Sequence, residues 1–257
     1  MFEYLEYFGL AIIPPFLLWD AFRGARSYRR PRFWRLRGLL VTVAAVALSI
    51  PVALIWADLT AGVSLLDLSA TGTWWGALIG ILVYEFGHYW YHRTAHRATW
   101  LWRSSHQMHH SAEAVDAFGA YFLHPIDVLA FTTLSSLVFF PLLGLTLEAG
   151  LLATAFLGFN AMFQHANIRT PHWLGYIIQR PESHCVHHGR GVHAFNYADL
   201  PLWDMVFGTF RNPRDVTGLE AGFYTGASAR IPAMLAGRDV SEPAAPSAAP
   251  PAAGLPA

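Results

Sequence analysis

Apolar residues gather into five stretches along this chain, and polar and charged residues are confined mainly to the segments between them. The stretches cover residues 4–22, 39–57, 68–84, 128–147 and 149–164. Residues 39–57 carry no charge, and at about 1.5 Å per residue a helix of this length nearly spans the core of a bilayer. Pro14-Pro15 interrupts the first stretch, so we expect a bent helix there. The pattern predicts an all-α fold, a multi-pass integral membrane helical bundle.

The last two stretches are close neighbours in the sequence. Only a few residues around Gly144 and Glu148 separate them. A connection this short places two helices antiparallel and next to each other. The spacing therefore predicts a tight helical hairpin that enters the membrane and returns to the same side.

Arginine residues mark one side of the predicted membrane. Seven of them lie between Arg23 and Arg37, in the short segment after the first apolar stretch. Positive residues in short loops are retained in the cytoplasm, which places this segment there and the connection near Asp58 and Asp67 outside. Alternation then returns the residues after the third stretch, and those after the hairpin, to the cytoplasmic side. We expect these residues to form a cytoplasmic helical cap.

The composition agrees with a membrane protein and excludes other classes. Hydrophobic residues make up 54% of the 257 residues and charged residues 13%, about half of what soluble domains carry. The formal net charge is +0, so no field attracts nucleic acid. A single cysteine, Cys185, excludes an intramolecular disulfide. All basic residues are arginine, and together with many Ala, Gly and Pro residues this favours a bacterial source, so we expect a protein of the bacterial inner membrane.

The end of the chain differs from the rest. From residue 238 onward it is mostly Ala, Pro and Ser, which supply too few apolar side chains to form a core. We expect residues 1–237 to form one membrane domain and residues 238–257 to be a disordered tail.

Most of the 13 histidines fall into three short groups, which we call boxes. The first box is the H-x-x-x-H pair His92 and His96, and each of the other two is an H-x-x-H-H run. These runs consist of His106, His109 and His110, and of His184, His187 and His188. On a helix, residues three and four apart share a face, with Cβ atoms about 5–6 Å apart. Each box is therefore expected to aim two or three imidazoles at one point.

The eight box histidines indicate a site for two metal ions. Neutral imidazole is a good ligand for Fe, Zn, Cu or Ni, and eight ligands exceed what one ion takes. A lone histidine is more often a hydrogen-bonded structural group than a ligand. Clustered imidazoles differ, because they repel one another when protonated and are costly to bury unless a cation binds them.

The order and spacing of the boxes resemble those of the fatty acid hydroxylase/sterol desaturase superfamily. The resemblance covers about residues 75–212, because the residues around the boxes agree as well. They are Tyr89-Trp90-Tyr91, Arg93, Leu101-Trp102-Arg103, Ser111, His124-Pro125, Gln164-His165-Ala166-Asn167, Asn196-Tyr197, Trp203-Asp204 and Phe207-Gly208-Thr209. The resemblance implies a membrane di-iron enzyme that uses O₂ and electrons to hydroxylate or desaturate a lipid. It also implies that His165, at the end of a predicted membrane helix, is a ninth metal ligand.

The residues alone leave the metal and the reaction open. Zn²⁺ also accepts an all-imidazole set, and a zinc site would make the chain a membrane hydrolase. However, no H-E-x-x-H motif is present, and hydrolytic zinc sites usually have three protein ligands. The resemblance, not the spacing, favours two Fe ions with O₂ as co-substrate. A membrane metal transporter is a further alternative, although transporter ligands usually lie near the middle of the bilayer.

The resemblance also implies partners. No haem or flavin motif is visible, so the electrons require a separate donor such as a ferredoxin or a cytochrome b5-like protein. The Arg-rich segment could dock an acidic donor, but setting the topology and contacting lipid headgroups is the more common role of such a segment. The lipid substrate stays open among sterol, fatty acyl chain, ether lipid and carotenoid.

Several residues outside the boxes have two interpretations. Glu85 shares a helical stripe with His88 and His92, where it could orient a ligand or satisfy a buried polar contact. Hydrogen bonds to the outer nitrogen of a metal-bound histidine could come from Asp204, Asn167 and Asn196, although each could equally cap a helix or stabilise a turn. The residues not expected to bind metal are His124, His172, His193 and Cys185.

Overall fold

Residues 9–243 are described by a computed structural model of the chain. Within these residues every regular element is a helix, and one isolated β-bridge joins Gly189 to Ala221. The prediction of an all-α fold is confirmed for this part of the chain. Residues 4–8 of the predicted first helix, and residues 244–257 of the predicted tail, lie outside it.

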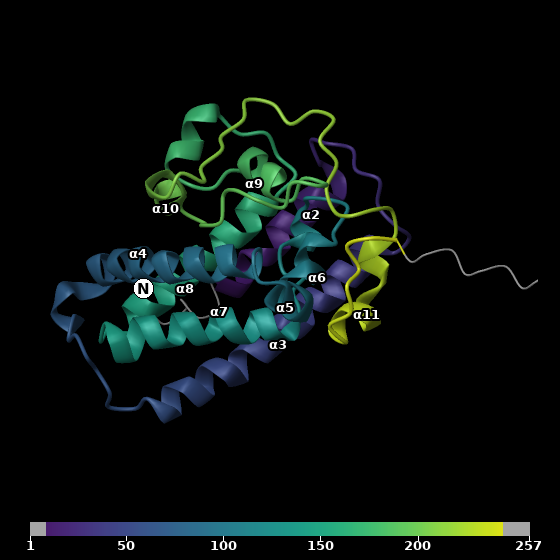
Figure 1. The fold of residues 1–257 in the computed structure, drawn as a ribbon. Coiled ribbons are helices and arrows are strands. Elements are labelled where there is room, and N and C mark those ends of the chain that lie inside the picture. Colours follow the sequence, from purple (N-terminus) through teal and green to yellow (C-terminus); the bar gives the residue numbers. More distant parts are fainter. Residues whose placement is uncertain (1–8, 244–257) are drawn as a thin grey trace, which may run out of the picture.

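Four long helices form the apolar part of the molecule (Figure 1). They are α3 (Trp34–Leu59), α4 (Gly72–Ala95), α7 (Pro125–Leu137), which continues into a π-helical turn (Val138–Leu142), and α8 (Leu147–His165). A shorter helix, α2 (Ile13–Phe22), precedes them. The remaining α- and π-helical segments are short: α5 (Thr99–Leu101), a π-helical turn (Trp102–His106), α6 (Gln107–His110), α9 (Pro181–His187), α10 (Pro201–Val206) and α11 (Ile231–Leu235). Short 3-10 helices cover Ser69–Thr71, Ala117–Gly119, His172–Tyr176 and Ala227–Ala229.

Two helices among the described residues are long and apolar enough to cross a membrane. They are Trp34–Leu59 and Pro125–Leu142, while the apolar helix Gly9–Phe22 is shorter. Helices α4 and α8 coincide with two more of the predicted stretches, but polar side chains such as Glu85 and Asn160 interrupt them. By length and composition the structure thus supports membrane association.

The long helices pack in two pairs, α4 against α8 and α3 against α7. Small residues allow the first pair to approach closely, since a Cβ atom added at Gly76 would lie 3.0 Å from that of Ala149. The prediction that the last two stretches pack against each other as a tight hairpin is wrong. A short connection joins α7 to α8, but α7 packs mainly on α3 and α8 mainly on α4. The π-helical turn Val138–Leu142 changes the course of the chain just before this connection.

The hairpin turn depends on a glycine. Gly144 has a φ of +61°, and a Cβ atom added there would lie 2.6 Å from the carbonyl oxygen of Leu66. We expect Gly144→Ala to destabilise the protein by about 1–3 kcal/mol, which a lower midpoint of thermal unfolding in detergent would reveal.

Gly62 provides the matched control for this variant. Its φ is +74°, but no heavy atom lies within 4 Å of an added Cβ. Gly62→Ala should therefore lower the unfolding midpoint less than Gly144→Ala does, because only the positive φ disfavours alanine there. Equal midpoints for the two variants would show that the close approach to Leu66 is unimportant.

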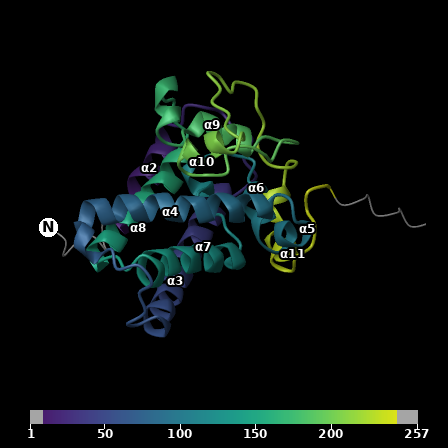
Figure 2. The ribbon, with the colours of Figure 1, turned by 60° about the vertical axis from the view of Figure 1, so that its left-hand side comes forward.

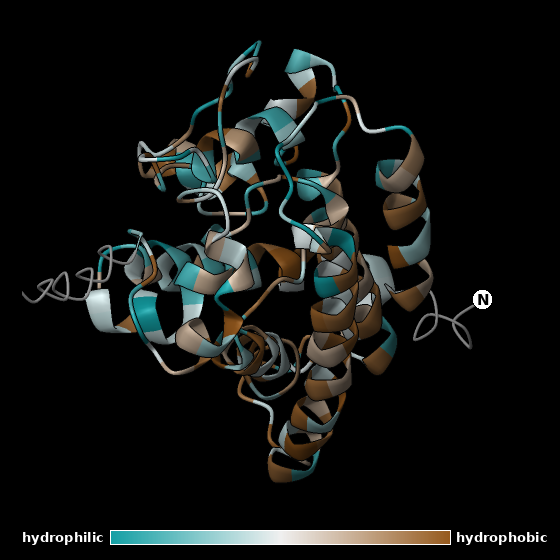
Figure 3. Ribbon diagram, turned by 90° about the vertical axis from the view of Figure 1, so that its right-hand side faces the viewer, coloured by the Kyte–Doolittle hydropathy of each residue, from teal (hydrophilic) through white to brown (hydrophobic). Residues whose placement is uncertain are grey.

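The residues after α8, which include α9 and α10 and which we call the cap, lie beside α4, above it in the view of Figure 2. Figure 3 shows that the long helices are mainly hydrophobic, whereas the loops and short helices beside them are more hydrophilic. The buried carboxylate of Asp20 connects α2 to the segment before α7 and to the segment after α8. It accepts hydrogen bonds from the backbone N–H groups of Ala117 (2.6 Å) and Asn167 (3.0 Å). Arg30 pairs with Asp116 at 2.9 Å. These contacts hold the Arg-rich segment on the cap.

Residues 238–241, which composition placed in the tail, pack against the second box. The side chain of Gln107 donates to the carbonyl of Arg238 (2.8 Å) and accepts from the N–H of Val240 (3.1 Å). Val240 is fully buried, and Arg103 forms an ion pair with Asp239 at 2.8 Å. The ordered part of the chain therefore extends beyond residue 237.

Candidate metal centre

The structure brings all nine predicted histidines together at the junction of the long helices and the cap. They form two groups, and the potential ligand atoms of each group all lie within 4.8 Å of one another. The first group is His92, His96, His106, His110 and His187, and the second group is His109, His165, His184 and His188. Eight of the nine are buried and His96 is half-buried.

Each histidine comes from the end of a helix or from a short helix. The end of α4 supplies His92 and His96, and the end of α8 supplies His165. The second box spans the end of a π-helical turn and α6, and the third box spans α9 and the residue after it. π-Helical turns occur frequently at functional sites, because the extra residue re-aims the side chains that follow.

The second and third boxes are divided between the two groups. His106 and His110 belong to the first group and His109 to the second, whereas His184 and His188 belong to the second group and His187 to the first. The structure differs here from the spacing argument, which aimed each box at one point. Successive helical residues are rotated by about 100°, so positions i+3 and i+4 diverge by that angle. One box can therefore serve two neighbouring sites.

Hydrogen bonds to the outer nitrogens fix the tautomers of several rings. The Nδ1 atom of His92 is 2.6 Å from the carbonyl oxygen of Tyr197, and that of His187 is 2.7 Å from the carbonyl of Phe195. A carbonyl oxygen only accepts, so both Nδ1 atoms carry hydrogen. The same holds for His165, whose Nδ1 lies 2.8 Å from the carbonyl of Ala161. In the neutral rings, each Nε2 is then an unprotonated lone pair.

These lone pairs point at one another. His106 donates from Nδ1 to the carboxylate of Asp127 at 2.9 Å, and its Nε2 lies 2.8 Å from the Nε2 of His92. The Nε2 atoms of His96 and His187 are buried, and no described residue is their hydrogen-bond partner. Converging lone pairs repel unless a cation lies between them. The donor set therefore fits metal ions, since ligands about 2 Å from one ion lie about 3 Å apart.

The environment keeps the cap histidines neutral. Burial lowers the pKa of His109, His110, His184, His187 and His188 well below the usual value, and the neighbouring imidazoles lower it further. Neutral imidazole is the form that binds metal.

These pKa shifts predict how the stability of the metal-free protein depends on pH. The unfolded chain takes up protons near pH 6.5, whereas the folded rings stay neutral to lower pH, so unfolding is favoured as the pH falls. We expect each such ring to lower the free energy of unfolding by up to about 1.4 kcal/mol per pH unit below pH 6.5. Thermal unfolding of chelator-treated protein at pH 7.5 and pH 5.5 tests this. An unchanged midpoint would contradict the neutral, clustered arrangement.

Asp127 belongs to the site although the sequence pattern did not indicate it. Its carboxylate is buried, accepts from His106 and also accepts from the hydroxyl of Tyr91 at 2.7 Å. A carboxylate that binds the outer nitrogen of a metal-ligand histidine orients the ring and raises its basicity. The feature of the sequence that could have identified Asp127 is its position three residues after His124, in the first turn of α7.

The three residues proposed for this outer role do not contact the histidines directly. Asp204 accepts from the N–H groups of Tyr197 and Ala198, both at 2.8 Å, and so holds the carbonyl that orients His92. Asn196 bonds to the backbone of Ser183 and Arg211, and Asn167 bonds to the backbone of Arg26. The latter two stabilise turns.

Glu85 and the residues that were not expected to bind metal each make contacts with other parts of the protein. One carboxylate oxygen of Glu85 accepts from the N–H groups of Asp199 (2.8 Å) and Leu200 (3.1 Å), a buried polar contact. His124 caps α7, and His172 lies 3.1 Å from the carbonyl of Asn212. His193 lies 3.1 Å from the Nδ1 of His110. Cys185 is buried among apolar side chains of the cap.

A cavity of about 580 Å³ connects the histidines to the apolar helices. Its walls come from α2, α3, α7 and α8 and include Ile13, Ala45, Val128 and Leu157. Its inner end includes His92, His106, His109, His165 and His184. No Arg occurs among the described residues that line it, and the one carboxylate among them, Asp199, accepts a hydrogen bond from the side chain of Gln164 at 2.8 Å. The cavity suits an uncharged apolar chain and leads it to both histidine groups.

Comparison with known proteins relates the site to enzymes. The sequence profile of the family described as "Fatty acid hydroxylase" matches residues 77–209. Alkylglycerol monooxygenase of Homo sapiens is 35% identical over 156 residues, 57% of this chain and 33% of that protein. Ornithine lipid hydroxylase OlsE of Rhizobium tropici is 33% identical over 56% of this chain and 44% of its own length. Sphinganine C4-monooxygenase 1 of Arabidopsis thaliana is 24% identical over 55% of this chain and 57% of its own length.

The chain thus aligns with between a third and somewhat over half of the length of these relatives. No solved structure matches it significantly.

Proposed function

Because this chain belongs to the fatty acid hydroxylase family, we propose that it is an oxidoreductase that uses O₂ to hydroxylate a membrane lipid at a two-iron centre. The proposed ligands of one iron are His92, His96, His106, His110 and His187, and those of the other are His109, His165, His184 and His188. The observation that carries the proposal is the set of converging Nε2 lone pairs at the inner end of an apolar cavity.

Iron is preferred to zinc because of the reaction that the relatives catalyse. Their names describe monooxygenases and hydroxylases, which insert oxygen into lipids. Zinc binds imidazole well but has no redox chemistry. When bound, a pair of redox-active ions would supply the oxidising power to break a C–H bond with O₂.

The chain itself contributes binding, orientation and exclusion of water. Asp127 and the carbonyl of Tyr197 fix the rings of His106 and His92, so that their Nε2 atoms face the centre. The apolar walls of the cavity bind a lipid chain and keep bulk water from the reacting carbon. Tyr121 and Gln164 on the cavity wall can hydrogen-bond to an uncharged polar group near that carbon.

We further propose that the chain crosses the membrane several times, with the histidines on the cytoplasmic side. The Arg-rich segment lies on the same cap as the third box, as the contact between Arg26 and Glu182 at 2.8 Å illustrates. By the positive-inside rule this cap faces the cytoplasm, where a separate electron donor is available. We place residues 1–237 in a single membrane domain, to which the contacts of residues 238–241 are added.

Oxygen labelling tests the proposal. A bacterial host that expresses the wild type is grown under isotopically labelled O₂, and its lipids are compared by mass spectrometry with those of a host that expresses His109→Ala. We expect one lipid class to gain a labelled oxygen atom only with the wild type. Loss of two hydrogens without oxygen would instead indicate desaturation. Metal uptake without any change in the lipids would contradict the proposal and favour a transporter.

A further inference from the structure

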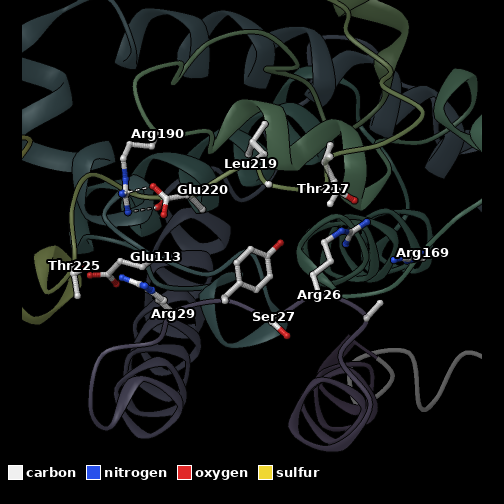
Figure 4. Close-up of a pocket in the computed structure, with 15 residues that line it drawn as sticks. Arg26, Ser27, Arg29, Glu113, Arg169, Arg190, Thr217, Leu219, Glu220 and Thr225 are labelled. Carbon is white, nitrogen blue, oxygen red and sulfur yellow. Dashed lines mark hydrogen bonds and ion pairs between the residues drawn. The ribbon is translucent and has the colours of Figure 1, made fainter.

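A second pocket, of about 470 Å³, lies on the cap and shares no lining residue with the lipid cavity. Four arginines from distant parts of the chain line this pocket, which we call the arginine pocket (Figure 4). They are Arg26, Arg29, Arg169 and Arg190. Ser27, Thr217 and Thr225 add hydroxyl groups.

The arginine pocket carries an excess of positive charge. Arg26 pairs with Glu182 at 2.8 Å and Arg190 with Glu220 at 2.5 Å. Glu113, which also lines the pocket, accepts hydrogen bonds from Gly226 and Ser228. Among the described residues, none lies within ion-pair distance of the exposed side chains of Arg29 and Arg169, and Arg169 has a longer-range electrostatic interaction with Asp215. Two guanidinium groups are thus available to an anionic partner.

The floor of the arginine pocket adjoins the third box. The hydroxyl of Tyr28 lies 3.4 Å from the sulfur of Cys185, which sits between His184 and His187 in the sequence. Next to the pocket wall, the N–H of Gly222 donates to the carbonyl of His188 at 3.2 Å. The pocket is therefore a cationic hollow on the outer wall of the histidine groups.

We propose that the arginine pocket docks an acidic one-electron carrier protein that delivers electrons to the metal centre. This inference rests on the proposed function. Hydroxylation of a C–H bond consumes O₂, two electrons and two protons and yields the alcohol and one water, so reduction from outside is needed in every turnover. Guanidinium groups bind carboxylates bidentately, and complementary charge both steers and orients a partner.

The position of the pocket favours a protein carrier over a lipid headgroup. A carrier must bring its redox group close to the centre, and the contacts through Tyr28 and Gly222 make this wall short. The lipid cavity, by contrast, reaches the histidines through α3, α7 and α8. The two pockets thus give separate routes for electrons and for substrate.

Charge reversal tests the inference on the full chain in lipid nanodiscs. Arg29→Glu and Arg169→Glu are compared with Arg32→Glu, which changes the same Arg-rich segment outside the pocket and whose guanidinium lies over the ring of Phe33. The donors are a plant-type ferredoxin and a soluble cytochrome b5, each with its reductase. We expect the KM for the better donor to rise by about tenfold or more in the two pocket variants, less so at high salt, and to change little in Arg32→Glu.

A single turnover after reduction with dithionite separates docking from chemistry. Its yield of labelled lipid should equal that of the wild type in all three variants. An unchanged KM in the pocket variants, or a wild type that turns over with dithionite but with neither acidic donor, would overturn the inference. A reduced single-turnover yield would also overturn it, because the pocket would then serve the substrate headgroup. If the wild type forms no product even with dithionite, the proposed function itself fails.

Discussion

Replacing His109 by alanine is expected to lower lipid oxidation at least about a hundredfold, because the variant removes an imidazole from the second histidine group. Only three rings, His165, His184 and His188, would then remain to hold that ion. The bound metal should fall from two ions per chain towards one. Elemental analysis and product formation, measured on the same purified sample, check both results.

Two further variants make this test specific. His187→Ala should remove the other ion instead, because His187 belongs to the first group although it lies in the third box. His172→Ala should keep both ions and nearly full activity, since its ring lies outside the groups and contacts the carbonyl of Asn212. Full activity of His109→Ala would show that the second group is not a metal site.

Replacing Asp127 by asparagine is expected to reduce activity by about 10–100-fold, although the residue touches no metal. The neutral amide binds the Nδ1–H of His106 less strongly than the carboxylate does, so the ring loses both basicity and orientation. The change should weaken metal binding in the first group. Titration of the metal-free variant with Fe²⁺ under anaerobic conditions, together with kcat, measures the effect.

The matched control removes the other partner of the same carboxylate. Tyr91→Phe deletes the hydroxyl that donates to Asp127 at 2.7 Å and leaves the contact to His106 in place. It should lower activity much less than Asp127→Asn. Equal losses in the two variants would mean that Asp127 acts only through packing of the helix.

Local periodicity predicted which histidines of one helix lie on the same face, whereas the inclusion of His165 came from the family resemblance. The spacing of His92 and His96 put both on one face of a helix, and their ring centroids lie 5.1 Å apart. The hydrophobic stretches likewise predicted α3, α7 and α8 to within a few residues, because long apolar segments have few alternatives to a helix.

Features that depend on tertiary geometry could not be predicted in the same way. His109 belongs to the second group and His187 to the first because of the way α6 and α9 face each other, which spacing within one helix does not specify. The role of Asp127 depends on α7 reaching His106 across 21 residues of sequence. The packing of Val240 against Gln107 arises from long-range hydrogen bonds in a segment whose composition alone indicates disorder.

Metal counting on active enzyme tests whether nine histidines hold two redox-active ions. The wild type is purified without oxygen, and iron, zinc and lipid-oxidising activity are measured on each preparation. We predict activity that rises in proportion to iron and reaches its maximum at two irons per chain. Maximal activity with a single metal ion per chain, or with two zinc ions and no iron, would show that the histidines do not form a two-iron centre.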